Sequence, residues 1–94
     1  MEVIIQKSTN KNKKFMANVH GKLIHFGAAG YEDYLHHTND NRKERYIKRH
    51  EKRENWNDPT TAGFWSKRLL WNKKSLKDSM HDINKRFNLK MKME

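Results

Sequence analysis

The chain has no cysteine, a single proline, four glycines and no long apolar run. Without cysteine it can form no disulfide, no thiolate metal site and no cysteine nucleophile, which fits a reducing compartment. No segment approaches the roughly 18 consecutive apolar residues of a transmembrane helix, so we expect no membrane partner. Residues 1–6 are too short and too soon interrupted to be a secretory signal.

Acidic residues are also scarce. The 94 residues carry 11 Asp and Glu against 21 Lys and Arg, a formal net charge of +10, and only 34% are hydrophobic. Low hydrophobicity with high charge favours disorder, whereas three Trp, three Tyr and four Phe supply large rings for a core. We expect one folded domain over residues 1–94, in which residues 1–13 and 88–94 are the segments that could be loosely ordered.

The clearest strand pattern lies between Lys14 and Gly27. His20 and Gly21 suit a two-residue turn. Pairing about this turn places three apolar or mixed pairs opposite one another: Val19 and Lys22, Ala17 and Ile24, Phe15 and Phe26. A β-hairpin is therefore predicted, with one apolar face.

Both ends of the chain carry further strand patterns. Val3, Ile4 and Ile5 are compatible with a third strand. Residues 89–93 alternate apolar and basic side chains with a period of two. The last segment either pairs with the N-terminal strand or frays.

The remainder of the chain is predicted to be helical. Residues 31–37 suit a short helix, and residues 39–41 offer an N-cap for a helix over residues 42–53. Asp58 as N-cap and Pro59 at the first position predict another helix, over residues 60–71. Ser75 and Asp78 resemble a capping box, and the apolar residues after it recur with helical spacing up to Phe87.

We therefore predict an α+β fold, with a small N-terminal antiparallel sheet packed against three to four helices. The apolar side chains on the predicted inner faces form the expected core: Phe15, Val19, Ile24, Phe26, Tyr46, Trp65, Leu69, Leu76, Met80, Ile83 and Phe87.

The expected helix over residues 42–53 has one strongly basic side. Six cations fall within an arc of about 140° on an ideal helix: Arg42, Arg45, Lys48, Arg49, Lys52 and Arg53. Such a surface suits phosphates, and Arg in particular matches their geometry. The alternatives are a solvated face that only keeps the protein soluble and a surface for an acidic protein. Too few apolar residues face the opposite side for a membrane-surface helix.

Aromatic and basic residues alternate again after this helix. Trp56, Phe64, Trp65 and Trp71 lie close in sequence to Lys67, Arg68, Lys73 and Lys74. Interleaved rings and cations can stack bases and bind a strand, but a chain with so few aliphatic residues also needs these rings in its core. Among them, Trp71 is the best candidate for an exposed ring, because its neighbours are basic.

The patterns of known catalytic sites are missing from the sequence. It contains no P-loop, no GxGxxG and no GxSxG. His36 and His37 are adjacent and point apart on regular structure, and no histidine belongs to an HExxH pair. We expect a non-enzymatic protein without cofactor or metal.

Four segments carry a family resemblance: GAAGY at residues 27–31, RKERY at 42–46, ENWNDP at 54–59 and TAGFWS at 61–66. With these motifs the chain resembles, over about residues 13–87, small basic proteins of unsettled function encoded by nucleocytoplasmic large DNA viruses. The resemblance implies a viral origin and a location in the virion, the viral factory, or the host nucleus or cytoplasm. It implies no active site.

The leading functional hypothesis is a viral nucleic-acid-binding protein, acting on DNA rather than RNA and with low sequence specificity. The expected contact residues are the basic helix face and the basic segment after it: Arg42, Arg45, Lys48, Arg49, Lys52, Arg53, Lys67, Arg68, Trp71, Lys73 and Lys74. The second hypothesis is a structural or interaction protein, either a minor virion component or a factor that binds an acidic host surface such as the nucleosome acidic patch.

Overall fold

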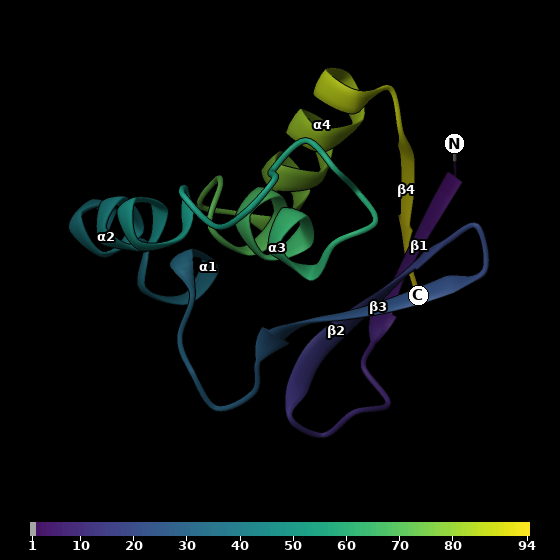
Figure 1. Ribbon diagram of the computed structural model, residues 1–94, viewed down its shortest axis with the longest axis horizontal. Coiled ribbons are helices and arrows are strands. Elements are labelled where there is room, and N and C mark those ends of the chain that lie inside the picture. Colours follow the sequence, from purple (N-terminus) through teal and green to yellow (C-terminus); the bar gives the residue numbers. More distant parts are fainter. Residues whose placement is uncertain (1) are drawn as a thin grey trace.

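A four-stranded mixed sheet forms one layer of the computed structural model, which describes residues 2–94 (Figure 1). Its strands, in the spatial order β3-β2-β1-β4, are β1 (Glu2–Lys7), β2 (Lys13–Val19), β3 (Lys22–Ala28) and β4 (Lys90–Met93). β1 pairs antiparallel with β2 and parallel with β4. The α+β class is confirmed, but the sheet is not purely antiparallel as expected. The helices between β3 and β4 form a crossover that brings β4 back in the direction of β1.

The hairpin of β2 and β3 has the predicted turn and register. Both turn residues have a positive φ, 53° at His20 and 84° at Gly21, which is the conformation of a type I′ turn. Phe15 pairs with Phe26, Ala17 with Ile24 and Val19 with Lys22. The alternate residues of both strands therefore share one face, and the helices pack on that face.

The two terminal segments meet in the sheet. Val3 pairs with Val19 of β2 on one side and with Met91 of β4 on the other. Val3 and Ile5 are fully buried, and Leu89 and Met91 are nearly so. Of the two alternatives for residues 89–93, pairing with the N-terminal strand is thus the one observed.

The helices lie on one side of the sheet (Figure 1). They are α1 (Tyr34–His37), α2 (Asp40–His50), α3 (Ala62–Trp65), the π-helical segment η1 (Ser66–Leu70) and α4 (Leu76–Phe87). The predicted caps of α2 and α4 are present. The Asn39 side chain accepts hydrogen bonds from the backbone of Asn41 and Arg42, and Ser75 accepts one from Asp78.

Helix α2 is shorter than predicted. It ends at His50, so Lys52 and Arg53 lie in the turn that follows and not on the helix. The backbone N–H groups of Arg53 and Glu54 both donate to the His50 carbonyl. The chain then turns so that the Glu54 carboxylate reaches the backbone at Gly63. A tertiary contact therefore accompanies this helix end, which no local Gly or Pro marks.

The prediction of a continuous helix from Asp58 was wrong in two respects. Thr61 is the N-cap of α3, accepting a hydrogen bond from Phe64, while Asp58 accepts hydrogen bonds from Thr60 in the preceding turn. The expected helix over residues 60–71 is also divided, because the Trp71 N–H donates to the carbonyl of Ser66, five residues earlier. This wider turn changes the directions in which the side chains after α3 point.

The core lies between the sheet and the segment formed by α3, η1 and α4. Most predicted core residues are buried, but Phe15, Leu76, Met80 and Phe87 lie at its margin and are only partly buried. Tyr46 is buried apart from this cluster. The prediction omitted several core members: Val3, Ile5, Ala17, Phe64, Leu70, Leu89 and Met91.

Gly27 marks the closest approach of the sheet to η1. Its φ is +81°, and a Cβ at this position would lie 2.8 Å from Cδ1 of Leu70. Only glycine meets both conditions without strain. This contact fixes where η1 lies above the open end of the hairpin, which forms one wall of the candidate site.

Candidate nucleic-acid interface

Helix α2 has a favourable arrangement of charges along its axis. Asn39 caps its N-terminus, and Lys48, Arg49 and His50 lie in its last turn. Cations in the last turn interact favourably with the negative end of the helix dipole. The helix is thus stable with an excess of positive charge on its surface.

A column of rings attaches α2 to the rest of the molecule. Tyr46 lies parallel to Trp71 with ring centroids 4.4 Å apart, and the His50 ring lies 4.4 Å from Tyr46 on the same helix. His37 adds a fourth ring, 5.2 Å from Trp71. Burial raises the pKa of Tyr46 to about 12, with the negative charge of Glu54 as a further cause. These contacts turn one side of α2 inward and leave its cations on the other sides.

A cleft of about 900 Å³ lies between α2, the open end of the β2–β3 hairpin and the α3–η1 segment. Aromatic residues, including Tyr31, Tyr46 and Trp71, contribute to its walls. Six Lys and Arg residues line it, against three acidic ones. The cations are Lys13, Lys14, Arg42, Arg45, Lys48 and Arg49, and the acids are Glu32, Asp33 and Glu54.

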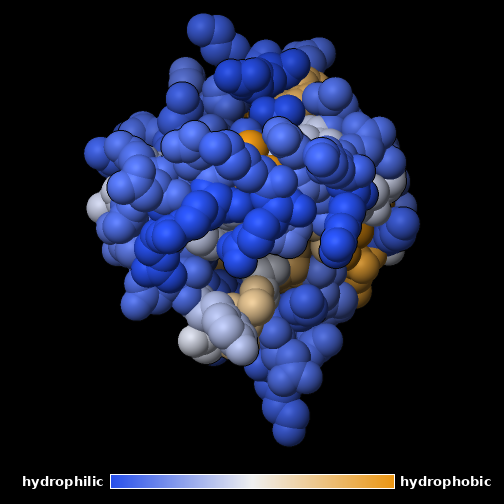
Figure 2. All heavy atoms as spheres, turned by 60° about the vertical axis from the view of Figure 1, so that its left-hand side comes forward, coloured by the Kyte–Doolittle hydropathy of each residue, from blue (hydrophilic) through white to orange (hydrophobic). Residues whose placement is uncertain are grey.

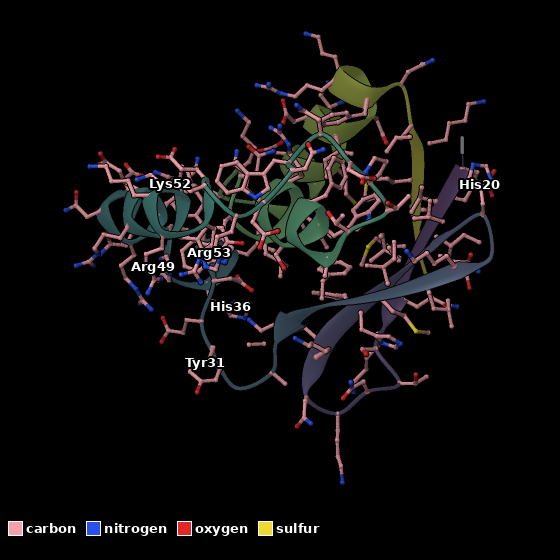
Figure 3. All side chains as sticks on the ribbon, viewed as in Figure 1. His20, Tyr31, His36, Arg49, Lys52 and Arg53 are labelled. Atoms are coloured by element: carbon pink, nitrogen blue, oxygen red, sulfur yellow. The ribbon has the colours of Figure 1, made fainter. Side chains whose placement is uncertain are left out.

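The surface on this side of the molecule is dominated by strongly hydrophilic side chains, with a small paler patch below them (Figure 2). In Figure 3, Arg49 and Arg53 lie on the side of α2 that faces the sheet, whereas Lys52 lies on the opposite side. Tyr31, which is 74% exposed, lies on the loop across from α2 in the same view. The cleft therefore presents cations from one wall and an exposed ring from another.

Several of the cleft cations have no ion-pair partner. Arg42 contacts Glu32 at 3.2 Å, and Lys48 contacts Glu44 at 3.4 Å, both at the exposed surface. Lys13, Arg45 and Arg49 form no ion pair within residues 2–94. Exposed pairs contribute little stability and are readily exchanged, so most of this positive charge is available to a ligand.

The deepest acid of the cleft is already neutralised. Asp33 is 3% exposed, and its carboxylate accepts from Lys14 at 2.7 Å and contacts His36 Nδ1 at 2.9 Å. Burial alone would raise the pKa of Asp33, but the hydrogen bonds from Lys14 and His36 outweigh it and hold the pKa below its usual value. Asp33 also caps α1 through the Leu35 N–H. It fixes the loop and does not offset the cations of α2.

The predicted contact residues divide into three groups. Arg42, Arg45, Lys48, Arg49 and Trp71 line the cleft. Lys52 and Arg53 follow the end of α2, and Lys73 and Lys74 precede α4, all four exposed. Lys67 and Arg68 lie on η1 without lining the cleft.

Trp71 is not the freely exposed ring that its basic neighbours suggested. It is partly buried, one face is covered by Tyr46, and His37 packs nearby. Its place in the column explains this, because the stack of Trp71 on Tyr46 holds α2. Tyr31 is the exposed ring of the cleft instead.

Sequence reasoning missed Lys13, Lys14 and Tyr31 as parts of the site. The hairpin register carries the signal that could have found them. It pairs Lys13 with Ala28, so the start of β2 and the GAAGY loop necessarily lie at the same end of the sheet. The approach of α2 to that end depends on tertiary contacts.

The arrangement of charges and rings suits binding of an extended anion. Within the described range of 2–94, no three His, Asp or Glu side chains gather in a way that could hold a metal ion. No helix in the same range has the length and apolar character needed to cross a bilayer. What the cleft provides is positive charge, hydrogen-bond donors and ring surface.

Comparison with known proteins gives one match. The model of a family of unknown function (DUF5754) matches residues 3–50, which run from β1 to the end of α2 and include two of the three walls of the cleft. Comparisons with curated proteins and with solved structures give no match.

Proposed function

We propose that this chain, which belongs to the family of unknown function (DUF5754), binds nucleic acid through the cleft beside α2. The observation that carries the proposal is the set of six Lys and Arg residues lining one cleft, of which Lys13, Arg45 and Arg49 lack ion-pair partners in the described chain. Each phosphate that these residues neutralise releases counterions and adds to affinity.

The ligand we propose is DNA, bound with low sequence specificity. Phosphate contacts position a protein on nucleic acid without reading its sequence. The exposed Tyr31 ring and the long Arg side chains of α2 can accommodate any base. The preference for DNA over RNA rests on the resemblance of the chain to proteins of large DNA viruses.

A salt series tests this proposal. Binding of a labelled oligonucleotide, measured by fluorescence anisotropy, should weaken by roughly 10³ or more between 50 and 200 mM salt if six phosphates are engaged. The double variant Arg45→Gln, Arg49→Gln should lower the slope of log K against log salt by about 2. Duplex DNA, single-stranded DNA and RNA of one sequence, run in parallel, identify the preferred form.

Lys77→Gln with Lys90→Gln is the matched control. It removes the same charge from two exposed positions that do not line the cleft. Equal losses of affinity in both double variants would show that net charge, and not the cleft, determines binding. Absence of binding at low salt would contradict the proposal outright.

An acidic protein surface is the alternative ligand for the same cations. A pull-down from host extract before and after nuclease treatment separates the two classes. If all partners are lost after nuclease treatment, the result supports nucleic-acid binding. A protein partner that is retained supports binding to an acidic protein surface.

We further propose that the chain is of viral origin and acts in the virion or in the viral factory. The four motifs GAAGY, RKERY, ENWNDP and TAGFWS support this. Antibody labelling of infected cells and purified particles, together with the position of the coding sequence in a viral genome, tests it.

A further inference from the structure

Lys67 on η1 is a partly buried cation with no anionic partner. Its ammonium forms no hydrogen bond or ion pair among the described residues, and Nζ lies over the Trp56 ring, 5.5 Å from the ring centroid. A lysine ammonium has three donors. All three of these donors are therefore open to a ligand.

Other cations surround Lys67. The pKa of Lys67 is lowered to about 8, chiefly by burial and also by the positive charges of Arg68, Lys43 and Arg86, against a smaller opposing effect of Asp82. These groups come from three elements: α2 supplies Lys43, η1 supplies Arg68, and α4 supplies Arg86 and Asp82. The cluster thus holds four positive charges around one carboxylate.

The carboxylate of Asp82 is already occupied. It accepts a hydrogen bond from Asn72 Nδ2 at 2.7 Å and from Arg86 Nε at 3.0 and 3.1 Å. Hydrogen bonds of this kind also keep the pKa of Asp82 below its usual value despite its burial. Asp82 orients Arg86 and leaves the cluster short of negative charge.

Both arginines are held through Nε, and most of their terminal donors are free. Arg68 Nε donates to the Trp56 carbonyl at 3.0 Å, and its guanidinium carbon lies 5.1 Å from the Phe87 ring centroid. Its Nη2 has a long contact of 3.4 Å with Asn57, while Nη1 has no acceptor within residues 2–94. The two Nη atoms of Arg86 are also without acceptors in that range. Fixed guanidinium groups of this kind suit the oxygens of a phosphate.

We propose that Lys67, Arg68 and Arg86 form a phosphate-binding site beside Trp56, separate from the cleft. A phosphate carries up to two negative charges and several acceptor oxygens, which match the surplus of charge and the free donors here. The phosphate comes either from a small ligand, as a free or terminal phosphate, or from the backbone of a nucleic acid. Since none of the three residues lines the cleft, this site does not depend on the function proposed above.

Labelling of lysines with an amine reagent, read by mass spectrometry, tests the site. In sodium chloride alone at pH 8, Lys67 should label faster than exposed lysines such as Lys77, because more of it is neutral. Inorganic phosphate at the same ionic strength should restore its charge and slow its labelling at least about tenfold, with Lys77 unchanged. A short oligonucleotide without terminal phosphates forms the second arm.

The arms distinguish the sources of phosphate. Protection by inorganic phosphate identifies a free or terminal phosphate, and protection by the oligonucleotide alone identifies a backbone phosphodiester. Protection by neither overturns the proposal. Arg86→Gln should abolish protection, whereas Lys85→Gln, on the same helix, should preserve it.

Different experimental outcomes contradict the cleft proposal and the phosphate-site proposal. The cleft variant Arg45→Gln, Arg49→Gln should keep the protection of Lys67 by inorganic phosphate. Loss of oligonucleotide binding with protection intact contradicts only the cleft. Normal oligonucleotide binding with an unprotected Lys67 contradicts only the phosphate site.

Discussion

The indole of Trp71 lies flat against the phenol ring of Tyr46, with centroids 4.4 Å apart and planes 1° from parallel. Polar contacts also join α2 to the body of the protein. One is the hydrogen bond from Lys43 Nζ to the Asn72 carbonyl, at 2.6 Å. This pair of rings is therefore a main determinant of the position of the basic helix, and with it of the width of the cleft.

Trp71→Ala should reduce the free energy of unfolding by about 2–4 kcal/mol, because it removes the ring against which Tyr46 packs. Oligonucleotide binding should weaken as well, since α2 loses its position. Urea denaturation measures the first effect and anisotropy the second. Trp71→Phe, which keeps a ring, is the matched variant and should lose less of both. Unchanged stability in the Ala variant would contradict the role given to the stack.

Tyr31→Ala should weaken binding of single-stranded oligonucleotides by a factor of about 5 to 100, the range expected for one base stacked on one ring. The ring is 74% exposed, so the stability of the protein should stay the same within about 0.5 kcal/mol. Tyr31→Phe keeps the ring surface and should bind like the parent. Equal affinity of all three proteins would show that no base stacks at this position.

Stability should fall at high pH through Tyr46. Its pKa is about 12 in the folded protein against 10.0 for an unperturbed tyrosine, so the unfolded chain loses this proton first. The contribution is fully present below pH 10 and is lost as the pH rises to 12. Its size is on the order of 2–3 kcal/mol. Denaturation from pH 8 to 12 measures it, and Tyr46→Phe should lack this part of the decline.

Stability should fall at low pH through Asp33. Its pKa is lowered in the folded protein, so its stabilisation is present above the usual value of 3.8 and disappears as the pH falls toward the folded pKa. Asp33→Asn should be less stable than the parent at pH 7, and the difference should shrink below about pH 4. Asp78→Asn, at an exposed residue without an ion pair in the described chain, controls for the loss of one charge.

Gly27 and Gly30 provide a matched pair of backbone tests. Both have a positive φ, +81° and +86°, but only a Cβ at Gly27 meets a neighbour, Leu70. Gly30→Ala should cost about 1 kcal/mol for its conformation alone. Gly27→Ala should cost about 1–3 kcal/mol more, because η1 has to move. Equal losses in the two variants would mean that Leu70 yields without strain.

The parts of the fold that the sequence predicted are those with local causes. The hairpin follows from the His20-Gly21 turn and from alternation on both sides of it, and α4 follows from the Ser75 cap and helical spacing. The end of α2 and the π-helical turn of η1 have no local signal. They accompany contacts such as that of Glu54 with Gly63, which exist only in the folded chain.

The site was predictable to the same extent. The cations of α2 lie close in sequence, and their common side follows from helical geometry. Lys13 and Tyr31 lie far from them in sequence, and only the packing of α2 over the open end of the hairpin brings them together. Trp71 was assigned by its basic neighbours, although a ring with such neighbours can equally pack on a tyrosine.

The parallel pairing of β1 with β4 has a consequence for the order of folding. The Gln6 side chain donates to that of Glu94, which is 88 positions away, and Val3 pairs with Met91. Contacts between such distant segments form slowly, because most of the chain has to be arranged first. The hairpin is local and can form early. We therefore expect the wall that carries Lys13 and Lys14 to appear early in folding, and the strand pair that completes the sheet to appear late.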